Sequence, residues 1–271
     1  MTPDRPPAAP GSRPPLRVAA VQLSPVTGDV GANAVDHARW VAEAAASGAR
    51  VVVFPQLSLT GYDPDLIDLH RIRVDPGDPR LEPLRRACRH HGVHAFVGAP
   101  VTEPRPVAVG AGSAPDGPPR IGTLHIDIAG RDRVAYLKRY LDVGEIGIFG
   151  PGVNDAVLPI GGWRLGLATG RDVTVADHHS RLAYAGVEVS LVSGLYVIGA
   201  EQRLAEQMAA ATRHGKWVVL AQFCGGTGGG PACGGSGVWA PGGHRVRQLG
   251  QEPGVVLVDV DLAQGVRTAG S

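Results

Sequence analysis

The sequence predicts an α/β protein in which two mixed β-sheets pack face to face, with helices on the outer face of each sheet. Near-continuous apolar runs alternate with stretches of helical periodicity, a pattern typical of parallel strands buried on both faces. This strand-helix-strand pattern occurs in both halves of the chain. Each half also contains segments in which polar and apolar residues alternate, and these indicate antiparallel strands. Two mixed sheets, each covered by its own helices, satisfy both observations.

In the first half, apolar residues between Ala34 and Ala45 recur at spacings that line one face of a helix, and Gly48 ends that helix. A Pro/Gly-rich stretch at 103–120 is given no regular structure. The predicted elements, in order, are strand 16–23, helix 34–45, strand 50–54, helix 79–91, strand 93–100 and a hairpin over 121–140 that turns at 129–132.

In the second half, the segment AVLPIGGWRLGLATGRD predicts two strands joined at Gly161 and Gly162. A Pro-Gly-Gly turn at 241–243 separates antiparallel strands near the end. Between these lie helix 175–185, strand 187–194, helix 199–214 and strand 217–223.

Composition excludes several classes of protein. The chain has 26 basic and 25 acidic residues, a net charge of +1, so no broad field favours nucleic acid or an anionic membrane. A small neutral ligand fits this balance better. No segment approaches the roughly 18 apolar residues of a membrane helix. The expected organisation is a disordered Pro-rich tail at 1–14 and one domain over 15–271.

The three cysteines indicate the redox environment. Cys88, Cys224 and Cys233 are odd in number and lack metal-ligand spacing, so we expect reduced thiols in a cytoplasmic protein. His90 and His94 lie four residues apart on the predicted helix, a spacing that a zinc site requires. Because no third ligand lies nearby, solvent-facing histidines are the preferred interpretation. We expect no metal and no cofactor.

The first candidate site follows the strand at 50–54. Ligands of α/β proteins bind at the carboxyl ends of strands, so the first polar side chain there, Gln56, is a candidate. The loop after the hairpin supplies Lys138 and Glu145. A lysine at a hairpin end is usually solvated, but the chain has only Lys138 and Lys216, so a functional role for Lys138 is retained as a hypothesis.

Two further strand ends are candidates. LGLATGRDV places Gly170, Arg171 and Asp172 at a strand-to-helix turn, where the alternative is a tight turn with a surface Arg-Asp pair. Cys224 ends a later strand, on the same side as the other candidates. It faces either a pocket or, in the alternative, the protein interior as a structural thiol.

Taken together, these segments resemble the nitrilase superfamily of carbon-nitrogen hydrolases over residues 16–262. The segments are FPQLSLTGY, YLKRYLDVGE, GLATGRD, GGSGVWAPGG and VVLVDVDL, in the family's order and spacing. The resemblance implies a four-layer αββα sandwich and a homodimer. It also implies a Glu-Lys-Cys triad in which the thiolate attacks an amide or nitrile carbon, the carboxylate transfers protons and the lysine stabilises the developing negative charge.

This chain departs from the family at two of those three positions. Gln56 occupies the place of the general base, and Gly170 occupies the place of the nucleophile, whereas Lys138 is kept. An amide cannot accept the proton, and glycine has no attacking atom, so the thiol chemistry does not carry over. We expect a site that is roomier by a cysteine side chain and less negative. Lys138 would then favour the neutral amine or an anionic ligand, unless Glu145 neutralises it.

Three functions stay open. The first is a repurposed lyase, cyclase, isomerase or non-thiol hydrolase for a small polar metabolite of specialised biosynthesis, in which Lys138 is the key group and Glu145 or Asp172 carries the proton. The second is a catalytically dead binding or scaffold protein that uses the family's dimer surface. The third is an amidase with Cys224 as a displaced nucleophile. The residues expected to contact the ligand are Gln56, Tyr62, Gly170, Arg171 and Cys224.

Overall fold

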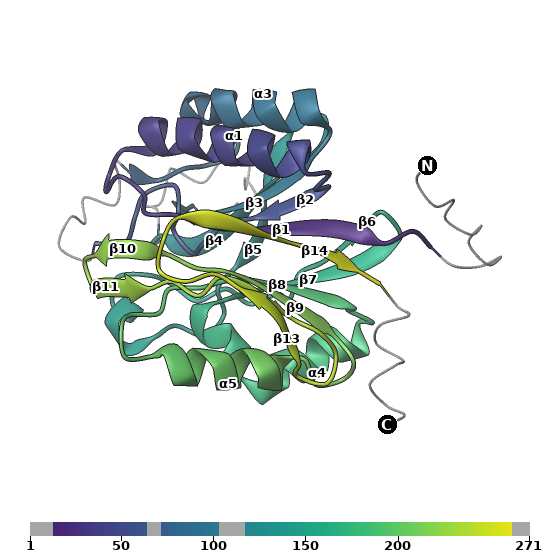
Figure 1. Ribbon diagram of the computed structural model, residues 1–271. Coiled ribbons are helices and arrows are strands. Elements are labelled where there is room, and N and C mark those ends of the chain that lie inside the picture. The colour runs from purple at the N-terminus through teal and green to yellow at the C-terminus, as the bar shows by residue number, and fades with distance from the viewer. Residues whose placement is uncertain (1–12, 64–71, 103–116, 262–271) are drawn as a thin grey trace, which may run out of the picture.

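Two six-stranded mixed sheets pack face to face at the centre of the computed structural model, of which residues 13–63, 72–102 and 117–261 are described (Figure 1). In the first sheet, β1, β2 and β3 are parallel, and the remaining neighbours are antiparallel. Its strands in spatial order are β14 (Gly254–Val260), β1 (Leu16–Gln22), β2 (Val51–Val53), β3 (His94–Val101), β4 (Arg120–Ile126) and β5 (Asp132–Leu137).

The second sheet repeats this plan, because β7, β8 and β9 are parallel and antiparallel strands flank them. A separate two-stranded hairpin of β10 (Cys224–Thr227) and β11 (Gly230–Cys233) lies beside it. The sheet's strands in spatial order are β13 (Arg245–Gln248), β12 (Gly237–Trp239), β9 (Trp217–Ala221), β8 (Val189–Ser193), β7 (Trp163–Thr169) and β6 (Val157–Ile160).

Helices cover the outer face of each sheet, which gives four layers (Figure 1). The helices α1 (Val30–Ala46) and α3 (Glu82–His91) lie on the first sheet, and α4 (Ala176–Tyr184) and α5 (Glu201–Ala211) lie on the second. Central strands such as β2 and β9 are buried on both faces because each sheet has one face on its helices and the other on the opposite sheet. The predicted four-layer αββα sandwich is therefore confirmed.

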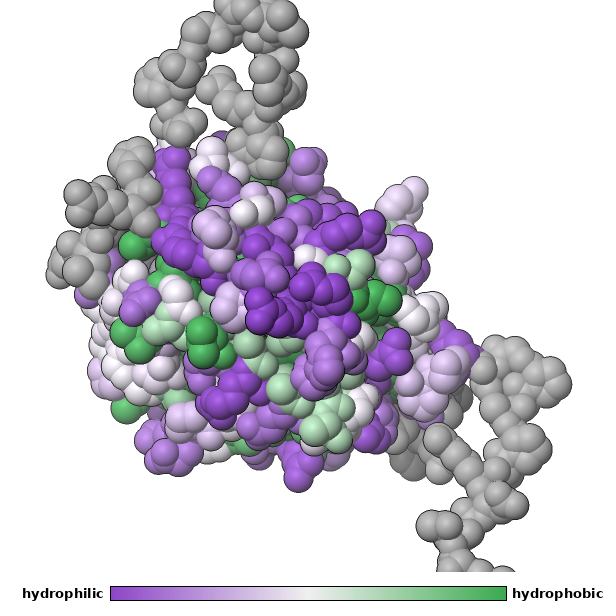
Figure 2. Space-filling view, turned by 90° about the horizontal axis from the view of Figure 1, so that it is seen from above, coloured by the Kyte–Doolittle hydropathy of each residue, from purple (hydrophilic) through white to green (hydrophobic). Residues whose placement is uncertain are grey.

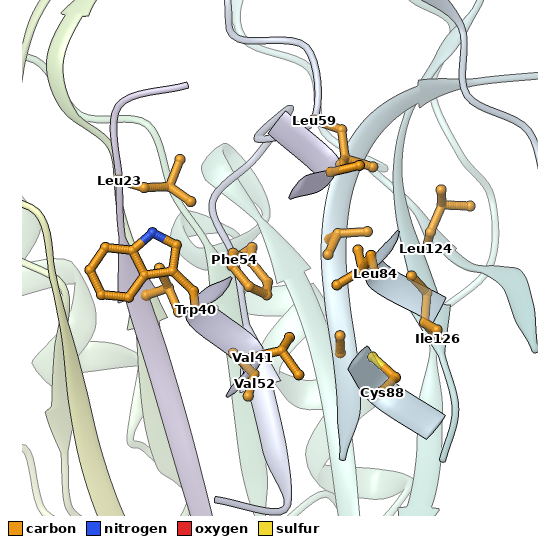
Figure 3. Packing of buried hydrophobic residues seen from close by; sticks show 14 of the residues in the cluster. Leu23, Trp40, Val41, Val52, Phe54, Leu59, Leu84, Cys88, Leu124 and Ile126 are labelled. Carbon is orange, nitrogen blue, oxygen red and sulfur yellow. The ribbon is translucent and has the colours of Figure 1, made fainter. Parts of the chain in front are cut away.

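Apolar side chains fill the space between α1, α3 and the first sheet. In Figure 3, Trp40 and Val41 of α1 and Leu84 of α3 point toward Val52 of β2 and Phe54 just beyond it. Another cluster fills the space between the sheets, where Phe96 and Trp163 are buried. The surface over α1 and α3 is, by contrast, mostly hydrophilic with small hydrophobic areas (Figure 2). Amphipathic helices with an apolar inner face explain both observations.

Some local predictions were wrong. His94 does not share a helix with His90: Gly92 adopts the left-handed conformation and ends α3, so His94 begins β3 and its Nδ1 lies 3.0 Å from His125 Nε2. Cys224 does not end a strand but begins β10. Residues 1–12 of the predicted tail and 103–116 of the Pro/Gly-rich stretch lie outside the described residues. Arg13, which is described, stacks on Trp163 with 3.9 Å from its Cζ to the ring centroid.

None of the helices in the described ranges is long and apolar enough to span a lipid bilayer.

Candidate functional site

Three strand ends from two sheets meet at one end of the sandwich. The chain leaves β2 toward Gln56, β5 toward Lys138 and β7 toward Gly170. A Cβ atom added at Gly170 would lie 2.7 Å from Gln56 Oε1 and 2.8 Å from Lys138 Nζ, so the three positions form a single site. The hydroxyl of Ser193, at the end of β8, donates to the carbonyl of Phe54 over 2.8 Å and ties the two sheets together there.

The turn after β2 directs Gln56 into the site. Leu57 adopts a left-handed conformation with φ of 56°, which is rare for a side chain of this size. Gly98 of β3 makes room for the turn, because a Cβ there would overlap the Leu57 nitrogen and the Pro55 carbonyl. Leu57 itself is held in a small apolar cluster with Ile121. Packing on both sides therefore fixes the position of the Gln56 side chain, which is 3% exposed.

The backbone of Lys138 is fixed from two sides. Its N–H donates to the Ile121 carbonyl over 2.8 Å, and its own carbonyl accepts from the Gly152 N–H over 2.7 Å. The next two backbone N–H groups, of Arg139 and Tyr140, donate to Asp172 Oδ1 over 3.2 and 2.9 Å. Lys138 is thus held in one place although it lies beyond the end of its strand.

Four polar side chains bind one another at the floor of the site, and we call them the lysine cluster: Gln56, Lys138, Asp142 and Glu145. Lys138 Nζ donates to Glu145 Oε1 over 2.7 Å, to Asp142 Oδ2 over 3.1 Å and, more weakly, to Gln56 Oε1 over 3.4 Å. Gln56 Nε2 also donates to Glu145 Oε1, over 2.8 Å. Glu145 Oε2 accepts from the Asp142 N–H over 2.8 Å, which fixes this loop as a short 3₁₀ turn.

Glu145 supplies the counter-charge to Lys138 that the sequence left open, and Asp142 supplies a second one. Lys138 contacts two carboxylates, Glu145 and Asp142, so its ammonium has counter-charges within the protein. The lysine side chain is fully buried, whereas Asp142 is exposed. An anionic ligand is therefore not needed to balance Lys138.

A cavity of about 480 Å³ opens above the lysine cluster. Its volume is in the range of ordinary small-molecule sites. The lining residues come from five loops and from α5: Gln56, Tyr62, Asp142, Gly144, Glu145, Gly170, Arg171, Thr174, Leu195, Tyr196, Val197, Arg203, Gln207 and Gly229.

Five of the eight residues predicted to form the site line this cavity: Gln56, Tyr62, Glu145, Gly170 and Arg171. Lys138 lies directly behind the wall, in contact with Gln56 and Glu145. Burial, with the nearby carboxylates of Glu145 and Asp142, raises the pKa of Tyr62. Tyr62 is therefore a neutral phenol at physiological pH that can donate one hydrogen bond to a ligand.

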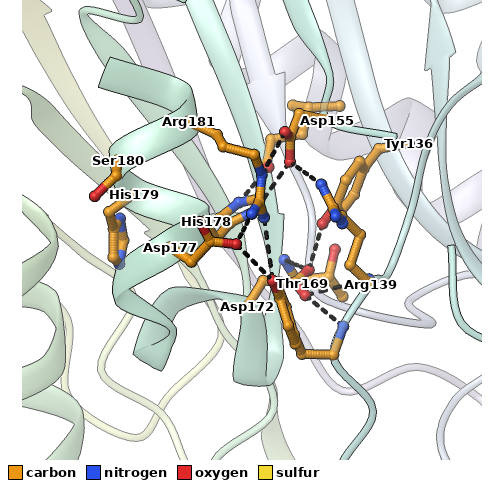
Figure 4. Close-up of polar contacts among 12 residues, drawn as sticks. Tyr136, Arg139, Asp155, Thr169, Asp172, Asp177, His178, His179, Ser180 and Arg181 are labelled. Carbon is orange, nitrogen blue, oxygen red and sulfur yellow. Dashed lines mark hydrogen bonds and ion pairs between the residues drawn. The ribbon is translucent and has the colours of Figure 1, made fainter. Parts of the chain in front are cut away.

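Asp172 is not brought to the cavity. It lies beneath it and accepts four hydrogen bonds: the two from the Arg139 and Tyr140 N–H groups, one from the Thr169 N–H over 3.0 Å and one from the Tyr136 hydroxyl over 2.8 Å. Figure 4 shows Asp172 close to Tyr136, Arg139 and Thr169, three of the residues that donate to it. The carboxylate joins the end of β5 to the end of β7. It therefore positions the backbone beside Lys138 and Gly170 and does not face the cavity itself.

Cys224 is also outside the cavity wall. It is 1% exposed, and its backbone N–H donates to the Leu23 carbonyl over 3.0 Å. Burial raises the pKa of its thiol to about 11, which leaves little thiolate at neutral pH. Cys88 and Cys233, the other two cysteines, do not line the cavity either.

Several lining residues were missed by sequence reasoning. Asp142 lies four residues after Lys138 in the segment already singled out, so its position was a usable signal. Arg203 and Gln207 stand one turn apart on α5, and Tyr196 donates from its hydroxyl to Gln207 Oε1 over 2.7 Å. Polar residues on a helix surface are ordinary, so nothing in the sequence distinguished these two.

The whole chain resembles known carbon-nitrogen hydrolases. A family model described as carbon-nitrogen hydrolase matches residues 17–269. A protein of Pseudomonas protegens named "Hydrolase in pqqF 5'region" is 26% identical over 250 residues, which cover 91% of this chain and 83% of that protein. A bromoxynil-specific nitrilase of Klebsiella pneumoniae subsp. ozaenae is 33% identical over 95 residues, 31% of this chain and 27% of the nitrilase.

Solved structures agree with the sequence matches. A mutant of the Nesterenkonia AN1 amidase, from the nitrilase superfamily, superposes with a TM-score of 0.77 at 26% identity, covering 96% of this chain and 95% of the amidase. The family model spans nearly all of the described residues, and the structural match includes both sheets. The chain therefore belongs to the carbon-nitrogen hydrolase family, within the nitrilase superfamily.

Proposed function

We propose that this chain is a non-hydrolytic member of its family whose cavity binds a small polar molecule bearing an amide group. The observation that carries the proposal is the space beside Gly170. No side chain extends from this residue, and Gln56 Oε1 and Lys138 Nζ occupy the space where a Cβ would stand. An attacking atom is absent, and the neighbouring polar groups fill its place.

The proton carriers of the lysine cluster are engaged with one another. Glu145 Oε1 accepts from both Lys138 and Gln56, and Glu145 Oε2 accepts from the Asp142 N–H. The three protons of the Lys138 ammonium have Glu145, Asp142 and Gln56 as acceptors. A carboxylate with this many donors is a poor general base, because proton uptake would break hydrogen bonds to charged and polar groups.

The cavity wall retains the groups that recognise an amide. Within the described part of the chain, Gln56 Oε1 accepts one weak hydrogen bond, from Lys138 over 3.4 Å, so it can also accept an N–H from a ligand. Tyr62 and Gln207 add hydrogen-bonding groups on the wall, and Leu195 and Val197 add apolar surface. A short amide with an alkyl group matches this combination.

Relatives support an amide ligand. The amidase of Nesterenkonia sp. AN1 has been solved as a cysteine-to-alanine mutant in complex with butyramide. A double mutant of the same amidase, with glutamate changed to glutamine and cysteine to alanine, is in complex with acrylamide. Gln56 and Gly170 parallel these two changes, and the double mutant still holds an amide.

Isothermal titration calorimetry with butyramide, and with butyrate as the matched acid, tests the proposal. We expect binding of butyramide, at least tenfold weaker binding of butyrate and no release of ammonia. Gln56→Met should weaken butyramide binding about tenfold, the effect of one lost hydrogen bond, whereas Gln202→Met on the exposed face of α5 should leave it unchanged. Circular dichroism confirms that both variants fold. Ammonia release, or equal binding of acid and amide, would contradict the proposal.

A double variant, Gln56→Glu with Gly170→Cys, provides a second test of ligand binding in the same cavity. If the cavity holds amides in the family's orientation, this variant should gain slow amidase activity against butyramide. The single Gly170→Cys variant is the control, because it supplies the thiol without the carboxylate.

A repurposed enzyme is the second candidate, and the position of Glu145 favours it. This carboxylate reaches the cavity wall beside Lys138, so a ligand that displaces the Gln56 N–H would leave Glu145 free to move a proton. Deuterium exchange at the α-carbon of butyramide in D₂O, followed by NMR, tests this function. Exchange that is lost in Glu145→Gln supports an enzyme, and exchange at the protein-free rate supports binding alone.

We also propose, from the family resemblance, that the chain forms a homodimer in the cytoplasm. Tyr184 at the end of α4 is 97% exposed, which is unusual for a large aromatic side chain and suits a contact between copies. Light scattering after size-exclusion chromatography should give twice the mass of the 28.1 kDa chain, and Tyr184→Ser should shift it toward the monomer.

A further inference from the structure

We propose that Cys224 and Cys233 are a dithiol positioned to form an intrachain disulfide across the β10–β11 hairpin, with a small-molecule disulfide as the oxidant. The two residues are direct register partners on these antiparallel strands. Both are free thiols in the structure. The site is separate from the lysine cluster, and the inference does not depend on the proposed function.

The backbone hydrogen bonds define which kind of strand pair this is. The Cys224 N–H donates to the Leu23 carbonyl over 3.0 Å, and the Cys233 N–H donates to the Tyr196 carbonyl over 2.9 Å. Both N–H groups thus point away from the partner strand, so the two cysteines form a non-hydrogen-bonded pair. Such pairs bring the Cα atoms to about 4.5 Å, with the side chains closer than in a hydrogen-bonded pair. This distance falls within the range of about 4.4 to 6.8 Å that disulfides require.

The two side chains lie on the same face of the hairpin. Their neighbours Phe223 and Ala232 both pack into the apolar core beneath α1. Since side chains alternate along a strand, Cys224 and Cys233 project together to the opposite face. They are 1% and 5% exposed. The contacts of the Cys233 sulfur are weak, a hydrogen bond to the Gly234 carbonyl over 3.4 Å and one from Gln222 Nε2 over 3.7 Å, so little holds it away from its partner.

The reaction is a two-step thiol-disulfide exchange. One protein thiolate attacks a sulfur of oxidised glutathione, forms a mixed disulfide and releases one glutathione thiolate. The second protein thiolate attacks the protein sulfur of that mixed disulfide and releases the second glutathione. The protein dithiol loses two protons and two electrons, and one oxidised glutathione takes them up to become two reduced molecules. Burial raises the pKa of both cysteine thiols, to about 11 for Cys224, so the rate should rise with pH.

The hairpin forms part of the cavity wall, so the disulfide would restrict the motion of that part of the wall. Gly229, between the two strands, lines the cavity, and the Gly228 N–H donates to the Tyr62 carbonyl over 2.7 Å. Four-residue strands rich in glycine open more readily than the sheets behind them. A covalent link at the base of the hairpin would limit this opening.

Oxidised glutathione added to the full-length native protein tests the inference. After quenching and denaturation, alkylation should label one thiol, Cys88, in place of three. Trypsin leaves both hairpin cysteines in one peptide, residues 217–245, which should become lighter by two hydrogen atoms. Cys88→Ser should behave like the parent chain, whereas Cys224→Ser should lose the internal link. Three thiols that remain free, a stable glutathione adduct or a link through Cys88 would overturn the inference.

A comparison of native and denatured protein shows whether the fold aligns the pair. At equal total glutathione, half-oxidation should need at least about tenfold less oxidised glutathione in the native state, because alignment raises the effective concentration of the partner thiol. The melting temperature of the oxidised chain should rise by about 3 to 6 °C. Equal half-oxidation in both states, or a fall in melting temperature on oxidation, would show that the native geometry opposes the bond.

Discussion

Gly170 shows how a lost side chain changes its neighbours. The sequence suggested a site with extra room, but Gln56 Oε1 and Lys138 Nζ fill the space, at 2.7 and 2.8 Å from where a Cβ would stand. The backbone φ of Gly170 is 51°, in the left-handed region. Both the backbone conformation and the packing at position 170 now suit glycine. A substitution that adds a side chain there should therefore lower the free energy of unfolding for two separate reasons.

A comparison of Gly170→Ala with Gly92→Ala distinguishes the effect of backbone strain on stability from the effect of packing. Gly92 has a similar φ of 65°, but nothing lies within 4 Å of an added Cβ. Urea denaturation should show that Gly92→Ala lowers the free energy of unfolding by about 1 kcal/mol, from backbone strain alone. Gly170→Ala should cost about 1 kcal/mol more, because Gln56 and Lys138 must move. Equal losses of unfolding free energy in the two variants would mean that Gln56 and Lys138 move aside without lowering stability.

The two lysines are both buried but differ in their partners. Lys138 has two carboxylates, whereas among the described residues Lys216 has one acceptor, the His179 carbonyl, 3.3 Å from its Nζ. Burial lowers the pKa of Lys216 to about 8. Lys138→Met should lower the free energy of unfolding by about 3 to 5 kcal/mol, because Glu145 is left as an unpaired buried charge. Lys216→Met should leave it unchanged or raise it, and similar losses for both would contradict this reasoning.

The pH dependence of stability provides a second readout for Lys216. Below pH 8 the folded protein holds a charged ammonium in a buried place, at a cost in stability. Between pH 8 and 10.5, the ordinary pKa, the folded chain releases this proton while the unfolded chain keeps it, so the cost is relieved as pH rises. The difference in urea midpoint between Lys216→Met and the parent chain should therefore shrink between pH 7.5 and 10.

At the scale of elements, Asp172 determines how β5 and β7 meet. Each of its carboxylate oxygens accepts two hydrogen bonds, and the donors come from both strand ends. Burial raises the pKa of Asp172, and these hydrogen bonds oppose that rise. Figure 4 also shows Asp155 bridging Arg139 and Arg181, which adds α4 to the same network.

Asp172→Asn should lower the free energy of unfolding by about 2 to 4 kcal/mol, because the new NH₂ group faces donors instead of accepting from them. Asp29→Asn is the matched control. It also changes a carboxylate that accepts a backbone N–H, at the exposed N-cap of α1, where asparagine caps nearly as well. Urea denaturation measures both. If Asp172→Asn loses no more than Asp29→Asn, the two strand ends are held by other contacts.

Sequence patterns predicted strand ends well and hairpin register poorly. The rule that ligands bind at the carboxyl ends of strands singled out Gln56, whereas the convergence of Gln56, Lys138 and Gly170 from two sheets was predicted from the family resemblance. The hairpin that pairs Cys224 with Cys233 was not predicted, because a glycine-rich segment has no apolar alternation to fix its register. The side-chain filling beside Gly170 was also beyond reach, since it depends on rotamers of residues far apart in sequence.

At the scale of the whole molecule, the buried histidines should make the fold sensitive to acid. Burial lowers the pKa of His37, His125 and His179 to about 4, from the ordinary 6.5. Above pH 6.5 these groups are neutral in both states, and stability is fully present. As pH falls from 6.5 toward 4, the unfolded chain binds protons that the folded chain does not, so stability is lost.

Urea midpoints at pH 7.5 and 5.0 check this prediction. The free energy of unfolding should fall by an amount on the order of 4 kcal/mol over that range. His37→Gln should flatten the dependence, whereas His90→Gln on the exposed end of α3 should not change it. A midpoint that stays constant between the two pH values would show that these histidines are protonated without cost.

The pairing of β1 with β14 joins the first described strand to the last, in register from Leu16 with Val260 to Gln22 with Gly254. During synthesis on the ribosome, one edge of β1 therefore has no partner until β14 has emerged. Throughout that time an apolar strand edge is open to chaperones and to other nascent chains. Completion of the first sheet therefore has to wait for residues 254–260, and a chain that stops short of residue 254 would keep that edge exposed.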